Sequence, residues 1–98
     1  MALKTYTHDG AAYLDTAEAQ EEYLIAAFET EDPAFISDAL GVVARAKSMT
    51  WLSEQTGLSR PALYKALSAD GNAGFATIMK VAHALGFNLS LTRAREPA

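Results

Sequence analysis

Leu-Ser-Glu-Gln-Thr-Gly-Leu-Ser-Arg-Pro-Ala-Leu-Tyr-Lys-Ala-Leu, residues 52–67, is the stretch that decides the fold. It predicts two short helices joined by a tight turn at Gly57, because glycine adopts the left-handed backbone of such a turn without steric cost. Ser53, four residues earlier, supplies the small side chain that is needed where the two helices press together. Ser59 is placed to cap the second helix, and Pro61 falls in its first turn, where a missing N–H costs nothing. This pattern is typical of a helix–turn–helix.

The second of these helices leaves a polar face that points away from the core. Arg60 and Tyr64 are four residues apart and therefore neighbours on one face, with Lys65 beside them. A recognition helix presents such a face to the major groove of DNA. The alternative is an ordinary solvated basic face on a small helical bundle. The candidate DNA-contacting residues are Ser59, Arg60, Tyr64, Lys65 and Ser68.

Length and composition exclude several classes of protein. The chain has 98 residues and no cysteine, which predicts one domain without disulfide bonds or thiolate metal sites. Residues 1–10 are polar, so we expect neither a signal peptide nor a membrane span, and we expect a cytoplasmic protein. There are two isolated histidines, no phosphate-cradling glycine loop and no carboxylate pair placed over a cleft. We therefore expect neither catalytic residues, nor a metal site, nor a cofactor.

The net charge of −4 is divided unequally along the chain. Residues 1–40 contain nine acidic side chains against one lysine, a net charge of −8. Residues 41–98 contain seven basic side chains against three acidic ones, a net charge of +4. Such a chain is suited to meet a cationic partner with one half and a phosphate-rich partner with the other.

Residues 15–86 predict an all-α bundle of five helices, preceded by an N-terminal arm at residues 1–14 that we expect to be extended or loosely ordered. The first helix is expected to start at Asp15, because Asp-Thr-Ala-Glu at residues 15–18 resembles a capping box.

Acidic side chains collect on the polar side of this first helix. The four that fall largely outside its apolar stripe are Glu18, Glu21, Glu22 and Glu29. An ordinary solvated face is the simpler interpretation of such a cluster. The other interpretation is a contact surface for a basic protein, and these four residues are then the candidate contacts.

Capping residues mark where the second and third helices begin. Asp32 is the expected N-cap of the second helix, and Pro33 its first helical residue. The third helix covers about residues 50–56 and is capped by Ser48 or Thr50.

The fourth helix covers about residues 60–68, so that the helix–turn–helix extends over about residues 50–68. The fifth helix runs over about residues 75–85 and ends at Gly86, a fitting residue for a left-handed helix end. One face of the fifth helix is apolar and is traced by Phe75, Ile78, Met79, Ala82 and Leu85.

Residues 87–92 alternate strictly between apolar and polar side chains, which predicts a short, half-buried β-strand before a polar tail at residues 93–98. A single strand has no partner within its own chain, and its backbone groups would be left unpaired. We therefore expect it to pair with the same strand of a second copy, forming a homodimer seam through Phe87, Leu89 and Leu91. Addition of the strand to a partner protein is the alternative.

The order of several short motifs resembles the addiction-module antidote proteins, which are small antitoxins with a lambda-repressor-like helix–turn–helix. The motifs are Asp-Pro (32–33), Ala-Leu-Gly (39–41), Val-Ala-Arg-Ala (43–46), Thr-Gly-Leu-Ser-Arg (56–60), Ala-Leu-Tyr-Lys-Ala-Leu-Ser (62–68), Gly-Asn (71–72), Phe-Ala-Thr (75–77) and Ala-Leu-Gly (84–86). The similarity covers about residues 13–91. Two departures are Pro61, where an acidic residue is common, and Gly74, where the helix cap is often threonine.

The resemblance implies a sequence-specific DNA-binding antitoxin that neutralises a toxin of the RelE/HigB type and represses its own operon. Such a toxin is a small, basic, ribosome-dependent mRNA-cleaving protein. The expected partners are double-stranded operator DNA, this basic toxin and a second copy of the chain, with no membrane involved. The alternative is a stand-alone helix–turn–helix transcription regulator that has no toxin.

Overall fold

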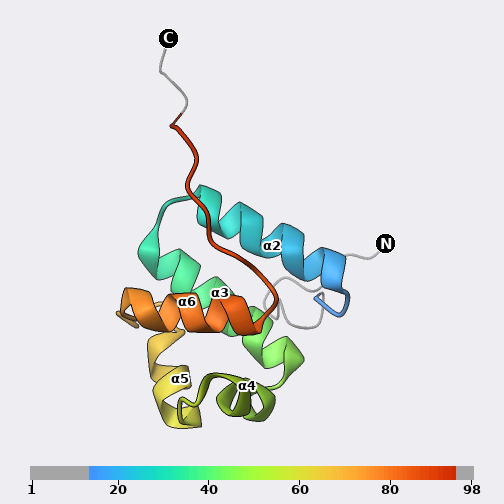
Figure 1. Ribbon diagram of the computed structural model, residues 1–98, viewed down its shortest axis with the longest axis vertical. Helices are drawn as coiled ribbons and strands as arrows, with labels where there is room; N and C mark the ends of the chain where they lie inside the picture. The colour runs from blue at the N-terminus through green and yellow to red at the C-terminus, as the bar shows by residue number, and fades with distance from the viewer. Residues whose placement is uncertain (1–13, 95–98) are drawn as a thin grey trace.

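The computed structural model describes residues 14–94, and that part of the chain is built of helices (Figure 1). The all-α class is therefore confirmed. The helices are α2 (Ala17–Glu29), α3 (Pro33–Lys47), α4 (Met49–Thr56), α5 (Arg60–Ala66) and α6 (Phe75–Ala84). Two predicted segments lie outside the described residues: residues 1–13 of the arm and residues 95–98 of the tail. None of the described helices is both long and apolar enough to cross a lipid bilayer.

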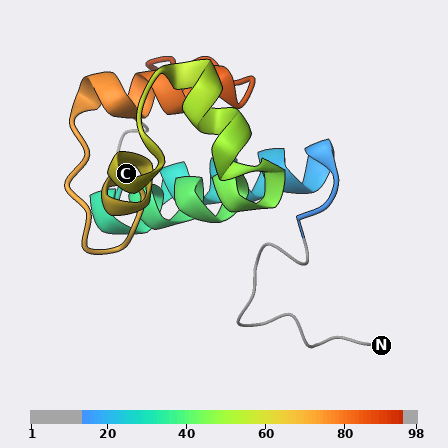
Figure 2. The same cartoon turned by 90° about the horizontal axis from the view of Figure 1, so that it is seen from below.

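Helix α3 is the centre of the bundle, because it contacts each of the other four described helices. Its Leu40 and Val43 are fully buried, and Gly41 lies between them. Helix α2 packs along one side of α3, while α4 and α5 lie together at the end of the molecule away from α2 (Figures 1 and 2). The other fully buried large side chains of the core are Leu14, Leu52, Leu63, Leu67 and Val81.

The packing of α2 on α3 partly buries one phenol. Burial of the Tyr23 hydroxyl raises its pKa above the usual value of 10.0, and the nearby charge of Asp38 raises it further, while Arg45 acts in the opposite direction. The phenol is therefore uncharged at neutral pH, which suits a position at a helix–helix contact.

Most of the predicted helix ends are confirmed by the caps that form them. The Asp32 carboxylate accepts from the Ala34 N–H at 3.1 Å, with Pro33 as the first residue of α3. The third predicted helix begins at Met49 and takes Ser48 as its cap, since the Ser48 hydroxyl oxygen accepts from the Trp51 N–H at 3.1 Å. Gly86 follows α6 with a φ of 98°.

The start of the first helix differs from the prediction. Thr16, not Asp15, is the N-cap of α2, and its hydroxyl oxygen accepts from the Ala19 N–H at 3.0 Å. Leu14, which the prediction placed in the loose arm, is fully buried in the core. Its carbonyl oxygen accepts from the side-chain amide of buried Gln20 at 3.0 Å, and this bond ties the entry of the chain to α2.

The buried face of α6 also differs from the predicted one. Ile78, Ala82 and Leu85 do pack on the core, but Phe75 is 72% exposed and Met79 is 43% exposed. Helix α6 is apolar on more than one side, so its sequence does not determine which side meets α3 and α4. In the structure, the side of α6 that carries fully buried Val81 packs against α3 and α4.

Residues 87–92 form no strand in this structure; within the described chain they are an extended segment that leaves α6 and passes beside α2 (Figure 1). A strand is defined by hydrogen bonds to a neighbouring strand. Residues 88–92 make no such hydrogen bond to another described residue of the chain, so the predicted strand is not formed here.

The turn between α4 and α5 is held by hydrogen bonds as well as by glycine. Gly57 has a φ of 78°, and its N–H donates to the Ser53 carbonyl at 2.9 Å. The Ser53 hydroxyl donates across the turn to the Leu58 carbonyl at 2.6 Å. The Thr56 hydroxyl donates to the Leu52 carbonyl at 2.8 Å and accepts from the Leu58 N–H at 3.2 Å. Two hydroxyl side chains therefore fix the corner at which α5 begins.

Gly41 allows α3 to approach the end of α5. A Cβ atom at Gly41 would overlap the carbonyl oxygen of Leu67, the C-cap residue of α5. We expect Gly41→Ala to lower the free energy of unfolding by about 1–3 kcal/mol, the usual cost of overpacking, as measured by urea denaturation. The control is Gly74→Ser, whose Cβ meets nothing within 4 Å and whose φ is −70°. If both variants lower the free energy of unfolding by the same amount, this account of Gly41 is contradicted.

The Ser53 hydroxyl is a second test of the corner. We expect Ser53→Ala to lower the free energy of unfolding by about 1 kcal/mol, because the partly buried Leu58 carbonyl loses its donor. Thr50→Ala removes a hydroxyl from an exposed position of the same helix and is expected to change the free energy by less than about 0.5 kcal/mol. Urea denaturation of both variants measures the difference, and indistinguishable values would contradict the assigned role of Ser53.

Candidate functional site

The outward face of α5 brings together the polar residues expected from the sequence. Arg60, Tyr64 and Lys65 are all exposed, and 44% of the Tyr64 surface is accessible. On the opposite side of the helix, Leu63 is fully buried. Because the core holds that side of α5, the row of Arg60, Tyr64 and Lys65 points into solvent. We call these three residues the α5 row.

The two predicted serine contacts lie at the ends of this helix. The exposed Ser59 caps α5, with its hydroxyl oxygen accepting from the Ala62 N–H at 3.2 Å. The half-buried Ser68 follows the helix, and its hydroxyl donates to the Lys65 carbonyl at 3.2 Å. Both hydroxyls thus have a structural role at the ends of α5, whatever else they contact.

The loop after α5 lies against the same surface. A Cβ atom at Gly71 would overlap the carbonyl oxygen of Ala66, so only glycine allows the loop to fold back on α5. The Gly71 N–H donates to the Ser68 carbonyl at 2.9 Å. Between loop and helix lies an open pocket of about 410 Å³, with Lys65 and Asn72 among its lining residues. The loop therefore extends the surface of the α5 row beyond Lys65.

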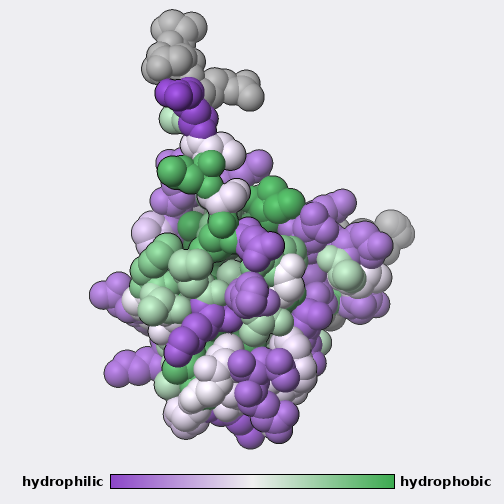
Figure 3. Space-filling view, in the orientation of Figure 1, coloured by the Kyte–Doolittle hydropathy of each residue, from purple (hydrophilic) through white to green (hydrophobic). Residues whose placement is uncertain are grey.

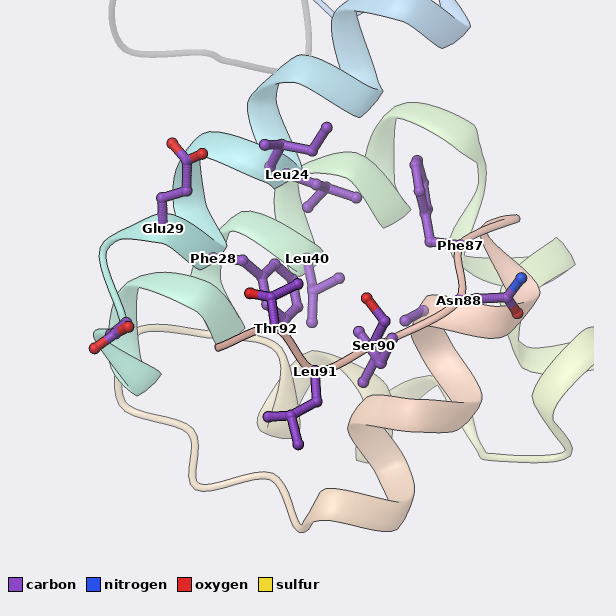
Figure 4. A pocket seen from close by; sticks show the side chains of 13 residues that line it. Leu24, Phe28, Glu29, Leu40, Phe87, Asn88, Ser90, Leu91 and Thr92 are labelled. Atoms are coloured by element: carbon purple, nitrogen blue, oxygen red, sulfur yellow. The ribbon is translucent and has the colours of Figure 1, made fainter. Parts of the chain in front are cut away.

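A second feature is the groove between α2 and the extended C-terminal segment. It has a volume of about 560 Å³ and is lined largely by apolar side chains, among them Ile25 and Phe28 of α2 and Leu89 and Leu91 of the segment. In Figure 4 the side chain of Leu91 points away from Phe28. Figure 3 shows hydrophobic surface gathered where the segment passes α2. We call this feature the α2 groove.

The four predicted acidic contacts are spread along α2. Glu18, Glu21, Glu22 and Glu29 are all exposed, but Glu29 alone lines the α2 groove, where Glu31 joins it. Glu31 is not among the four acidic contacts expected from the sequence. It follows α2 directly and has a φ of 57°, a backbone shape uncommon outside glycine that a helical pattern does not reveal.

The described residues contain no group of three or more histidine, aspartate or glutamate side chains that would hold a metal ion. The exposed His83 lies with Lys80 in an open pocket of about 410 Å³ between α4 and α6. Every buried side-chain nitrogen or oxygen of the described chain has a hydrogen-bond partner.

Comparison with known proteins gives the chain its family. A family model described as "Probable addiction module antidote protein" matches residues 4–93. An uncharacterized protein of Haemophilus influenzae is 39% identical over 87 residues, which cover 89% of this chain and 90% of the relative. No solved structure shows significant similarity to the chain. The family model spans nearly the whole chain, including the α4–turn–α5 corner, the α5 row and the α2 groove. The chain therefore belongs to the family of probable addiction module antidote proteins.

Proposed function

We propose that this chain is a sequence-specific DNA-binding antitoxin with a lambda-repressor-like helix–turn–helix. In this proposal it acts in the cytoplasm, neutralises a small basic toxin of the RelE/HigB type and represses its own operon. The observation that carries the DNA-binding part is the α5 row, a cationic and aromatic face held outward by the burial of Leu63. Membership of the antidote family supports the antitoxin role.

In the proposed complex, α5 enters the major groove and the α5 row faces the base edges. The Arg60 guanidinium is suited to a bidentate contact with guanine, and Tyr64 lies one turn along the same face. We expect Lys65, Ser59 and the backbone of the loop at Gly71 to contact phosphates, which would fix the register of the helix on the duplex. Two copies related by a twofold axis would place two such helices about 34 Å apart on a palindromic operator.

Removing the Arg60 guanidinium tests direct reading of the operator. We expect Arg60→Ala to weaken operator binding by about 1–3 kcal/mol, roughly 5- to 150-fold, while binding to random duplex changes much less. Gel-shift titration of the DNA upstream of the gene and of a random duplex, at one stated salt concentration, measures both affinities.

The matched control is Lys80→Ala, which removes one exposed positive charge from α6 and leaves the α5 row intact. It is expected to change operator binding less than Arg60→Ala does. If Arg60→Ala weakens binding to the operator and to random duplex by the same factor, Arg60 contacts a phosphate and not a base. Wild-type protein with no preference for the operator would contradict the proposal.

The acidic face of α2 is the proposed meeting place for the toxin. Charge complementarity mainly raises the association rate, and salt screens it. We therefore expect Glu21→Lys with Glu22→Lys to slow association with the basic protein encoded beside this gene. The effect on dissociation is expected to be small, and the slowing is expected to shrink at high salt. Surface plasmon resonance at two salt concentrations measures both rates.

Glu54→Lys with Asp70→Lys reverses two exposed acids outside α2 and serves as the control that is matched in net charge. Association that is slowed equally by this change would contradict a toxin contact on α2. A stand-alone regulator is the alternative, and it shares the DNA-binding tests but requires no toxin. It becomes the better account if no adjacent reading frame encodes a basic protein that binds this chain.

A further inference from the structure

Pro61 lies on the outermost line of α5. Neighbouring residues of a helix are about 100° apart around its axis, so Pro61 and Lys65 each lie about 20° from the direction opposite Leu63. Leu63 is fully buried, whereas Pro61 and Lys65 are both exposed. A surface that lies against the outward side of α5 therefore meets the Pro61 ring as well as the α5 row.

The two flanks of α5 differ in what they present. Arg60 and Tyr64 lie on one flank, and both are exposed. On the other flank, Ala62 and Ala66 line the open pocket between the helix and the loop that follows it. Pro61 lies between these flanks and is the next residue of the chain after Arg60. It is therefore placed to meet the base pair beside the one that Arg60 contacts.

The chemistry of the proline ring limits what it can contact. Its nitrogen lies in the backbone and carries no hydrogen, so the ring presents only C–H groups. The major-groove edges of the bases carry hydrogen-bond donors and acceptors, and thymine alone adds a methyl group. An apolar ring laid over a donor or acceptor would leave that group without water and without a partner, which is unfavourable. An exposed proline facing base edges therefore favours thymine.

We infer that Pro61 selects a thymine in the base pair next to the guanine contacted by Arg60, by packing on the thymine methyl group. This inference rests on the proposed function and specifies two neighbouring base pairs of the operator half-site. The first residues of a recognition helix are the ones that contact base edges, and Pro61 is the second residue of α5. Lys65 lies one turn further along the helix and is left to the phosphates.

Helix geometry by itself accounts for a proline in a first turn, and Pro33 at the start of α3 is another example in this chain. What distinguishes Pro61 is its orientation, because it lies on the side of α5 that the core leaves free. The two prolines therefore form a matched pair for experiment.

Uracil in place of thymine removes the methyl group and changes no hydrogen-bonding group of the major-groove edge, so it tests the contact on the wild-type protein. Footprinting of the DNA upstream of the gene locates the operator, and the relaxed specificity of Arg60→Ala identifies the guanine. Uracil then replaces each thymine of the half-site in turn. We expect the thymine next to that guanine to be the sensitive one, with binding about fourfold weaker per half-site, the usual effect of one methyl group.

The protein variants test whether Pro61 is the group that detects the methyl. Pro61→Ala is expected to bind the thymine and uracil operators equally well, and Pro33→Ala is expected to keep the fourfold difference found for the wild type. Gel-shift titration at one stated salt concentration measures the affinities, and thermal unfolding followed by circular dichroism verifies that both variants are folded.

Several results would overturn the inference while leaving the DNA-binding proposal intact. They are specific operator binding without a uracil-sensitive thymine, a sensitive thymine that is not next to the guanine, and a uracil effect that survives Pro61→Ala or is lost equally in Pro33→Ala. A wild-type protein without operator preference would instead contradict the proposed function, and the inference with it.

Discussion

Burial of Leu63 and Leu67 is the constraint on which the exposed face of α5 depends. Both side chains are essentially inaccessible, and together they fix which side of this seven-residue helix faces the core. A helix this short is marginal in isolation, so its orientation comes from packing rather than from its own hydrogen bonds. The close approach at Gly41 and the corner at Gly57 place α5 where its Leu63 and the C-cap residue Leu67 reach that core. The α5 row faces solvent because the side of the helix that carries buried Leu63 has to face the core.

The molecule separates two kinds of surface at its two ends. One end, formed by α4 and α5, presents cationic and hydrogen-bonding groups together with loop backbone. The other end, formed by α2 and the C-terminal segment, presents an apolar groove with acidic side chains around it. Helix α3 contacts both ends, so the two surfaces share one core. In the proposed function this division separates the two partners, because DNA and a basic protein demand opposite charges of the surfaces that bind them.

Features that depend on neighbours in the sequence were predictable, and features that depend on distant parts of the chain were not. The caps at Asp32, Ser48 and Ser59 and the left-handed glycine at Gly57 follow from side chains within three or four residues. The burial of Leu14 does not, because it results from packing against the finished bundle. The α2 groove escaped prediction for the same reason, since its walls come from opposite ends of the chain. The outward orientation of the α5 row was predictable from the sequence, because apolar Leu63 and Leu67 recur at helical spacing between polar residues.

The central claim is that the α5 row, and not the acidic surface of α2, meets nucleic acid. Amide chemical-shift mapping of the isotope-labelled full-length chain, titrated with the DNA upstream of its gene, tests this claim most directly. The account predicts that the largest shifts fall on residues 59–72, with little change along α2. Shifts concentrated on α2 or on the C-terminal segment, or none beyond those produced by random duplex, would contradict it.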